Sequence, residues 1–198
     1  MDLFSSPHIL TPIPLPDGEL ALLGQLAISL DKEAALAALI AETGWKAEHI
    51  TLYGRRHLQP RLTAWHGEAS YTYSGLTLDP LPFTALQREI KAAVEAATGR
   101  RFNSVLLNYY RNERDSMGMH SDDEPELGAA PAIASVSFGA TRSFILRHKR
   151  SKQTVKLDLE AGSLLLMSGE TQKNWLHGIN KQAQHCGPRV NLTFRYIS

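Results

Sequence analysis

Residues 120–122 read His-Ser-Asp, a spacing that could hold a metal ion. In an extended segment, residues i and i+2 point to the same side, so His120 and Asp122 present an imidazole and a carboxylate to one place. A metal site needs a third ligand, and His177 is the best remaining candidate. Two histidines and one carboxylate bind iron(II) and leave positions open for oxygen and a cosubstrate. The same groups also suit zinc, so a zinc hydrolase stays open here, as does a surface pair in a polar loop.

The segment 189–195 alternates two kinds of side chain. It reads Arg-Val-Asn-Leu-Thr-Phe-Arg, which puts Val190, Leu192 and Phe194 on one face of a strand. The other face carries donors for a carboxylate or a phosphate: Arg189, Asn191, Thr193 and Arg195. The two arginine Cα atoms would lie ~20 Å apart, and their side chains could lean inward to hold both ends of a short dicarboxylate. A binding site for a dicarboxylate argues against a hydrolase, which needs none. The alternative for this segment is an ordinary half-exposed strand.

Asn108 and Tyr110 share one face of a strand-like segment that precedes the His-Ser-Asp sequence. An amide and a phenol beside a metal could hydrogen-bond carboxylate oxygens. We therefore expect both side chains next to the predicted centre.

Two helices and a series of strands must position these side chains. The first helix is predicted to run from an N-cap at Asp31 to Gly44. The second begins at a capping box of Thr84 and Gln87 and ends at Gly99. Strand-like runs follow at 104–110, 133–138, 143–148, 154–159, 163–167 and 190–197. No convincing helix separates these runs, so we expect antiparallel sheets in an α+β fold, with a sandwich or barrel in the second half.

Composition excludes several classes of protein. The 198 residues carry 21 Lys and Arg against 20 Asp and Glu, so any affinity for nucleic acid must come from local patches. The single cysteine, Cys186, excludes an intrachain disulfide and makes a reduced, cytoplasmic location the default expectation. No apolar run approaches the ~20 residues of a membrane-spanning helix. The proline-rich first twenty residues do not look like a signal peptide and are predicted to be an extended arm or loop.

Taken in order along the chain, four separated elements resemble the AlkB family of Fe(II)- and 2-oxoglutarate-dependent dioxygenases. They are Asn108-x-Tyr110, His120-x-Asp122, His177 and the segment 189–195. Residues 71–77, 120–124, 133–140 and 144–149 are similar to the branch of that family that repairs duplex DNA. The resemblance covers roughly residues 51–197.

The resemblance implies a double-stranded β-helix (jelly-roll) core with N-terminal helices and a nucleotide-recognition lid. One domain is expected, with an arm and helix at 1–50, the lid and a helix at 51–98 and the catalytic core at 99–198. The implied Fe(II) ligands are His120, Asp122 and His177. The residues implied to surround 2-oxoglutarate are Asn108, Tyr110, Arg189, Asn191, Thr193 and Arg195. Dioxygen would take the remaining position on the metal.

The implied activity is oxidative N-demethylation of alkylated nucleobases in DNA, such as 1-methyladenine and 3-methylcytosine. It would couple decarboxylation of 2-oxoglutarate to succinate and CO2 with release of the methyl group as formaldehyde. Such lesions are cationic and easy to flip out of the base stack. Two alternatives stay open: a dioxygenase of the same fold that acts on RNA or a protein side chain, and a non-catalytic module that binds nucleic acid.

The resemblance also assigns residues to the flipped base. Asp123, with Glu124 beside it, matches an acidic contact that favours a cationic lesion. Tyr73 matches an aromatic residue that sandwiches the base, and Tyr71 a polar aromatic residue nearby. Tyr53 stands where the duplex branch carries a phenylalanine wedge that fills the vacated stack.

Basic residues are expected to contact the nucleic-acid backbone. Arg61 is assigned to the strand opposite the lesion. An acid-free run is expected to follow phosphates: Arg142, Arg147, His148, Lys149, Arg150 and Lys152. A solvated hairpin turn is the alternative for that run. The expected partner is alkylated DNA or RNA rather than a membrane, and the protein is expected to be a monomer.

Overall fold

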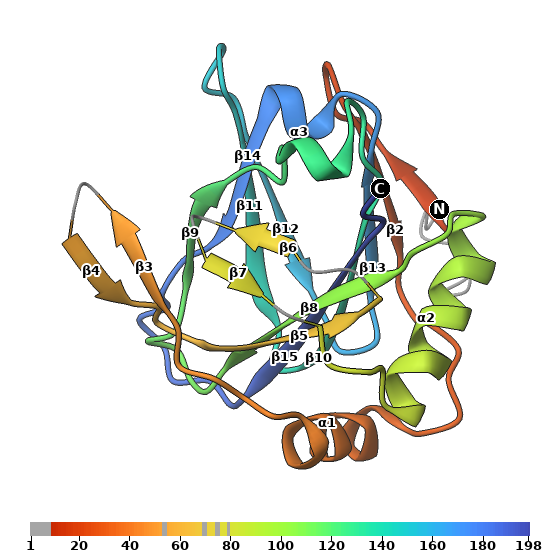
Figure 1. The fold of residues 1–198 in the computed structure, drawn as a ribbon. Helices are drawn as coiled ribbons and strands as arrows, with labels where there is room; N and C mark the ends of the chain where they lie inside the picture. Colours follow the sequence, from red (N-terminus) through yellow and green to blue (C-terminus); the bar gives the residue numbers. More distant parts are fainter. Residues whose placement is uncertain (1–8, 53–54, 69–70, 74–75, 79) are drawn as a thin grey trace.

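Three layers make up the fold in this computed structural model, which describes residues 9–52, 55–68, 71–73, 76–78 and 80–198 (Figure 1). Helices α1 and α2 pack on one face of a seven-stranded sheet, and a four-stranded sheet faces the other side. Within every sheet of the described part, neighbouring strands pair antiparallel, which confirms the expected α+β class.

Local signals in the sequence fix the two long helices. Asp31 caps α1 by accepting a hydrogen bond from the Ala34 amide at 2.7 Å. Thr84 opens α2 with the predicted capping box, and Gly99 closes it in the left-handed conformation at φ 63°. The helices are α1 (Lys32–Glu42), α2 (Ala85–Thr98) and the short α3 (Thr171–Asn174), with one 3-10 turn, η1 (Pro125–Leu127). The sequence did not predict α3. No helix in the described ranges is long and apolar enough to cross a membrane.

The seven-stranded sheet has the strand order β1-β2-β13-β10-β15-β8-β5. Its strands are β1 (Thr11–Ile13), β2 (Glu19–Leu23), β5 (Leu62–Gly67), β8 (Ser104–Tyr110), β10 (Ile133–Gly139), β13 (Leu164–Ser168) and β15 (Arg189–Arg195). The predicted extended arm is therefore wrong for β1 and β2, because Leu20 and Leu23 are buried and β2 pairs with β13. Pro12 is tolerated in β1 because that strand is at the sheet edge. Strands β1, β2 and β5 also make the predicted core of residues 99–198 too short.

The four-stranded sheet has the order β12-β11-β14-β9. Its strands are β9 (Met117–His120), β11 (Arg142–His148), β12 (Thr154–Leu159) and β14 (Trp175–Ile179). Two hairpins form two-stranded sheets of their own: β3 (His49–Leu52) with β4 (Arg55–Leu58), and β6 (Tyr71–Tyr73) with β7 (Leu76–Leu78). Both hairpins lie in the segment 51–98 or at its border, where the lid is expected. Their role as a lid stays a prediction.

Strand β15 lies inside the large sheet, between β10 and β8. Val190, Leu192 and Phe194 pack in one core cluster with residues of α1 and α2. Burial of such side chains contributes roughly 1.5–3 kcal/mol each. All seven residues of β15 are buried, so the alternative of a half-exposed strand is wrong. The polar face of β15 therefore points into the space between the two sheets.

Candidate active site

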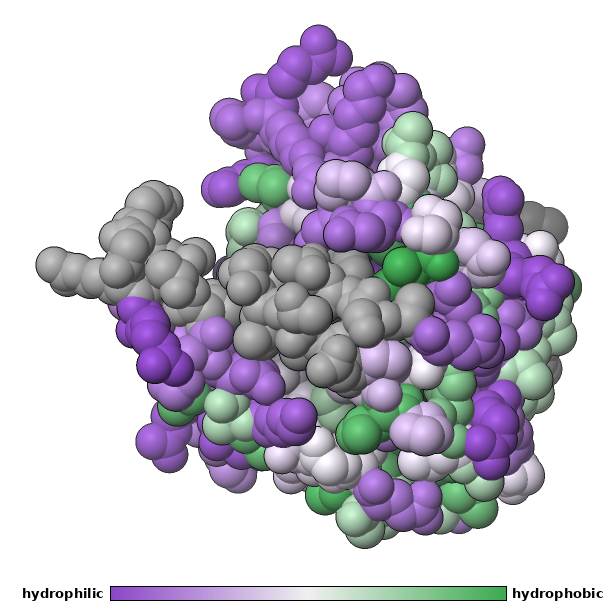
Figure 2. Space-filling model, in the orientation of Figure 1, coloured by the Kyte–Doolittle hydropathy of each residue, from purple (hydrophilic) through white to green (hydrophobic). Residues whose placement is uncertain are grey.

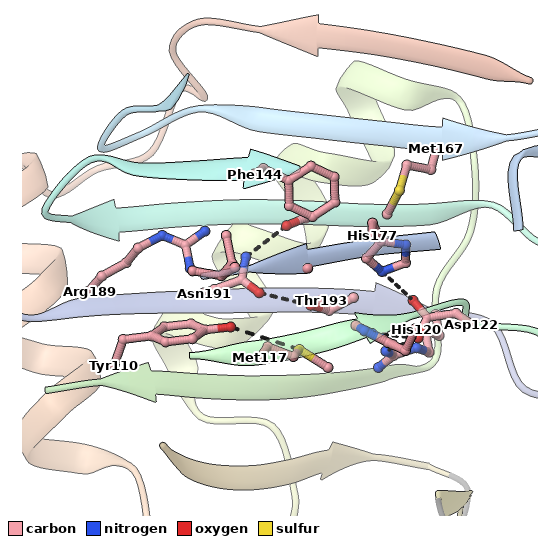
Figure 3. A pocket seen from close by; sticks show the side chains of 14 residues that line it. Tyr110, Met117, His120, Asp122, Phe144, Met167, His177, Arg189, Asn191 and Thr193 are labelled. Carbon is pink, nitrogen blue, oxygen red and sulfur yellow. Dashed lines mark hydrogen bonds and ion pairs between the residues drawn. The ribbon is translucent and has the colours of Figure 1, made fainter. Parts of the chain in front are cut away.

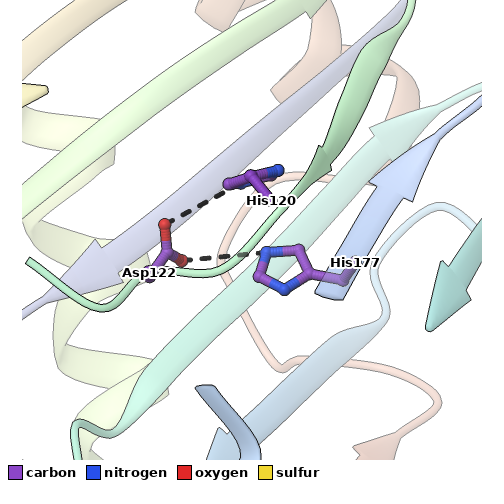
Figure 4. Close-up of side chains that lie close together, drawn as sticks. All are labelled: His120, Asp122 and His177. Carbon is purple, nitrogen blue, oxygen red and sulfur yellow. Dashed lines mark ion pairs between the residues drawn. The ribbon is translucent and has the colours of Figure 1, made fainter. Parts of the chain in front are cut away.

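Three potential metal ligands converge at one edge of the space between the sheets (Figure 4). His120 ends β9, and β14 places His177 opposite it in the strand register. The Nε2 atom of His120 lies 3.9 Å from Oδ1 of Asp122, and the Nε2 atom of His177 lies 3.9 Å from Oδ2. One ligand atom from each residue lies within 4.8 Å of the others. The convergence predicted from the His-x-Asp spacing is thus observed.

Asp122 is fully buried, and one hydrogen bond holds its carboxylate while another holds its backbone. Nη2 of Arg195 donates to Oδ1 at 2.8 Å, and Oε1 of Gln172 accepts from the Asp122 backbone amide at 3.0 Å. Burial opposes ionisation, but the positive charge of Arg195 lowers the pKa of Asp122 to about 2. The Oδ2 atom has no hydrogen-bond partner among the described residues. A buried anionic oxygen that faces two imidazoles fits a divalent cation.

The imidazoles are prepared for the same role. Burial lowers the pKa of His177 to about 3, and His120 adds to this effect, so His177 is neutral at physiological pH. The neutral ring is the form that binds a metal. The ring of Phe144 stacks on His177 at 5.3 Å between centroids. Nδ1 of His120 donates to the Gly118 carbonyl at 2.9 Å, which turns Nε2 toward Asp122.

A cavity extends from the triad along β15 (Figure 3). His120 and Asp122 lie at one end, and Arg189 and Tyr110 lie at the other. The residues that line it are Tyr110, Met117, His120, Asp122, Ser135, Phe144, Met167, His177, Gly178, Ile179, Arg189, Asn191, Thr193 and Arg195. The cavity therefore joins a cation site to the donor face that the alternation of β15 predicted.

The end of the cavity farther from the triad, the distal end, is positively charged. Arg189 is 1% exposed, and its Nη2 donates to Oγ of Ser137 at 2.9 Å. Its Nε and Nη1 atoms have no partner among the described residues. A buried guanidinium without a counter-ion costs several kcal/mol. Unsatisfied donors at this position fit a carboxylate ligand.

A family model of the 2OG-Fe(II) oxygenase superfamily matches residues 21–195. The chain belongs to this superfamily. The name of the superfamily contains two groups, Fe(II) and 2-oxoglutarate, and the cavity offers a cation site and a face of carboxylate donors. As an oxygenase, the superfamily also uses dioxygen.

Two curated relatives place this 2OG-Fe(II) oxygenase in the AlkB family. It is 45% identical over 172 residues to the human "Alpha-ketoglutarate-dependent dioxygenase alkB homolog 3", covering 82% of the chain and 60% of the relative. It is 43% identical over 158 residues to the human "DNA oxidative demethylase ALKBH2", covering 75% of the chain and 60% of the relative. The matched part thus spans about 60% of each relative's length.

A solved structure supports the fold of this oxygenase. The structure of OsALKBH1 superposes with a TM-score of 0.68 at 19% identity, covering 93% of this chain and 99% of that chain. At this identity the likeness concerns the fold alone, and it confirms the jelly-roll class.

One predicted cosubstrate residue, Asn108, lies beside the cavity wall as the cross-strand partner of Asn191. Asn108 is buried in β8 but does not line the cavity. Its Oδ1 atom accepts a hydrogen bond from Nε of Arg61 at 2.7 Å. Arg61 is only 4% exposed, so the prediction that it contacts the opposite nucleic-acid strand is wrong. The two residues instead form a buried pair between β5 and β8.

The predicted basic run divides into buried and surface residues. Arg142 is 1% exposed and His148 is 4% exposed, so the phosphate-contact prediction is wrong for both. Nδ1 of His148 accepts hydrogen bonds from the backbone amides of Arg150 and Ser151, which fixes the turn between β11 and β12. Figure 2 shows hydrophilic side chains gathered over this turn, at the top of the view. The exposed basic residues there are Arg147, Arg150 and Lys152.

Lys149 and Asp123 lie next to the metal ligands. Nζ of Lys149 donates to the Gln172 carbonyl at 2.9 Å and lies 3.4 Å from Oδ2 of Asp123. Asp123 is exposed directly after Asp122. Glu124 is half-buried, and its Oε2 atom has no hydrogen-bond partner among the described residues.

The aromatic residues assigned to the base belong to the hairpin region. Tyr71 and Tyr73 lie in β6, where their backbones pair with Leu78 and Leu76 of β7. Tyr53 lies outside the described residues.

Sequence reasoning missed several cavity residues. Ser135, Phe144 and Met167 come from β10, β11 and β13, whose patterns marked them only as ordinary strand residues. Gln172 was also missed, because it belongs to the unpredicted helix α3. Only the folded sheets show which of these residues face the cavity.

Proposed function

We propose that this protein catalyses oxidative N-demethylation of alkylated nucleobases in DNA, such as 1-methyladenine and 3-methylcytosine. The reaction would consume 2-oxoglutarate and dioxygen and give succinate, CO2, formaldehyde and the restored base. The observation that carries the proposal is a cavity with a buried His-Asp-His cluster at one end and, at the other, Arg189, whose Nε and Nη1 atoms have no partner among the described residues. The name of one relative, "DNA oxidative demethylase ALKBH2", supports the choice of reaction and substrate.

The side chains of the cavity would share the work of binding. His120, Asp122 and His177 would hold Fe(II), and Arg195 would keep the carboxylate ionised and oriented. Arg189 would bind the distal carboxylate of 2-oxoglutarate, with the Asn191 amide and the Thr193 hydroxyl beside it. These two polar groups already hydrogen-bond each other at 3.0 Å. When bound, Fe(II) with the cosubstrate and dioxygen supplies the oxidising chemistry that hydroxylates the N-methyl group, after which the hydroxymethyl group leaves as formaldehyde.

The nucleic acid would bind at the open side of the triad. The negative charge of Asp123 would favour a cationic methylated base over a neutral one. Lys149 and the exposed basic residues of the β11–β12 turn would contact phosphates. We extend the proposal to base contacts by Glu124, Tyr71 and Tyr73, to a wedge role for Tyr53 and to a lid formed by the two hairpins. A cytoplasmic monomer is proposed with it.

The decisive experiment measures turnover. Oligonucleotides that carry 1-methyladenine or 3-methylcytosine are incubated with the protein, Fe(II), 2-oxoglutarate and air. Formaldehyde, succinate and the restored base are then quantified. Single-stranded DNA, double-stranded DNA and RNA are compared in parallel, and we expect the DNA substrates to be repaired. Asp122→Ala should abolish turnover, while Asp158→Ala, an exposed carboxylate on β12, should leave it unchanged.

Two outcomes would contradict this proposal. Turnover of methylated RNA alone would replace DNA by RNA as the substrate. A folded protein that binds 2-oxoglutarate and demethylates no nucleic acid would refute the demethylase.

A further inference from the structure

Arg142 is a buried cation whose position differs from that of the surface bases near it in sequence. It begins β11 and is 1% exposed. Its Nη1 donates to the Asn112 carbonyl at 3.2 Å, and its Nη2 donates to the carbonyls of Asp115 and Asn180 at 2.9 and 2.6 Å. One guanidinium therefore satisfies three backbone acceptors.

These three acceptors belong to two segments that continue into the walls of the cavity. Asn112 and Asp115 lie in the turn between β8, which carries Tyr110, and β9, which carries Met117. Asn180 directly follows β14, whose last residues line the cavity. Arg142 thus ties together two separate stretches of chain behind the distal end.

Tyr110 connects this guanidinium with the cosubstrate site. The Cζ atom of Arg142 lies 5.6 Å from the centroid of the Tyr110 ring, and the Cζ atom of Arg189 lies 5.1 Å from the same centroid. Both are within the range of cation–π attraction. Two buried positive charges therefore contact one aromatic ring at the distal end.

The described residues supply little negative charge to balance the pair. None of the ion pairs among them includes Arg142 or Arg189. The carboxylate of Asp115 is bound by the side chain of Arg111, and Arg142, although it is near enough to feel this charge, hydrogen-bonds only the backbone carbonyl of Asp115. Two like charges buried together are unfavourable unless an anion joins them.

We propose that Arg142 is a positioning residue for the distal carboxylate of 2-oxoglutarate. It holds Tyr110 and the two wall segments in place, and its charge adds to that of Arg189 without contact with the ligand. The inference deepens the proposed function, and it depends on that function only for the use of 2-oxoglutarate.

The test compares two ligands that differ only at the distal end. 2-Oxoglutarate and 2-oxopentanoate have the same chain length, but 2-oxopentanoate has a methyl group in place of the distal carboxylate. Dissociation constants are measured by calorimetry on the Mn(II)-loaded protein without oxygen and without nucleic acid. The variants are Arg142→Met, Arg142→Lys and, as a matched control, Arg114→Met, which removes an exposed arginine from the same turn.

We expect Arg142→Met to weaken binding of 2-oxoglutarate about tenfold and to change binding of 2-oxopentanoate little. Arg142→Lys keeps the charge and should lose less than about threefold, and Arg114→Met should lose nothing. In the turnover assay, Arg142→Met should show a raised KM for 2-oxoglutarate and a nearly unchanged kcat.

Equal weakening of both ligands, or no weakening of either, would overturn the inference and leave Arg142 with a purely structural role. If Arg142→Met does not fold, Arg142→Lys is judged by the same comparison, and an equal loss for both ligands again overturns the inference. Because no nucleic acid is present, failure of the demethylase assay leaves this result intact. The two proposals can therefore fail separately.

Discussion

The Nη2 atom of Arg195 lies 2.8 Å from Oδ1 of Asp122, and both side chains are buried. The sequence places Arg195 in the dicarboxylate cradle and Asp122 in the metal site. Their ion pair joins these two sites, because the Arg195 guanidinium that holds the Asp122 carboxylate also lines the cavity.

Replacing Arg195 should reveal the cost of an unpaired buried charge. We expect Arg195→Met to lower the free energy of unfolding of the metal-free protein by about 3–5 kcal/mol, because Asp122 then has no buried counter-charge. The double variant Arg195→Met with Asp122→Leu should recover much of this loss, since it removes both charges. Urea unfolding measures both values, and a double variant that is less stable than Arg195→Met would contradict the prediction.

A divalent metal should stabilise the wild-type protein through Asp122. With Mn(II) at 100 times its dissociation constant, we expect a gain of about 2.7 kcal/mol, which chelation by EDTA should reverse. Asp122→Asn should show little gain, because it removes the charge that the cation needs. Thermal unfolding with and without Mn(II) measures the gain, with Asp158→Asn as the exposed control. An equal stabilisation of Asp122→Asn by Mn(II) would contradict the prediction and show that the metal binds elsewhere.

Acid should weaken the turn that Arg142 holds. Burial opposes ionisation of Asp115, but hydrogen bonds from Arg111 lower the pKa of Asp115 below its ordinary value of 3.8. A lowered pKa in the folded state gives stability that is present above the ordinary value and is lost as the pH falls through the lowered one. We expect Asp115→Asn to cost about 2 kcal/mol at neutral pH, and the difference from wild type should shrink below about pH 4.

Urea unfolding between pH 2.5 and 7 measures this difference. Glu170→Gln, which alters an exposed carboxylate paired with Lys173, serves as the control and should change stability little. A constant gap between wild type and Asp115→Asn over the whole range would contradict the assignment.

The basic turn between β11 and β12 should make nucleic-acid binding depend on salt. Removing two phosphate contacts with Lys149→Ala and Arg150→Ala should reduce the slope of log affinity against log salt concentration by about two. Fluorescence anisotropy with a labelled oligonucleotide measures the slope. Arg100→Ala with Arg101→Ala, two exposed arginines after α2, is the control pair. Unchanged affinity of the first pair at low salt would refute the phosphate contacts.

Local patterns made the two long helices and six of the strands predictable. The capping box at Thr84, the stop at Gly99 and the alternation in β15 all depend on neighbouring residues, and all are observed. The six strands predicted after Gly99 are present, with ends shifted by at most two residues. The candidate metal ligands could also be predicted from the sequence, because His120 and Asp122 are close in sequence and His177 completes a known ligand set.

The rest depended on contacts between distant segments. Arg61 and Arg142 look like solvated bases in sequence, and only their buried acceptors on β8 and beyond β14 show otherwise. The prolines near the N-terminus suggested an arm, but a sheet edge accepts Pro12 because an edge strand leaves some amides unpaired. The hydrogen bond between Arg61 and Asn108 joins residues 47 positions apart in the chain, so no local pattern predicts it, and the cosubstrate role of Asn108 stays a prediction.

Strand β15 separates two parts of the interior: one face packs in the core with α1 and α2, and the other lines the cavity. Loosening α1 or α2 would shift Val190 or Phe194, and the same backbone would carry Arg189 and Arg195 out of alignment. We therefore expect the catalytic rate to fall when the packing of α1 or α2 loosens, at temperatures below the onset of global unfolding.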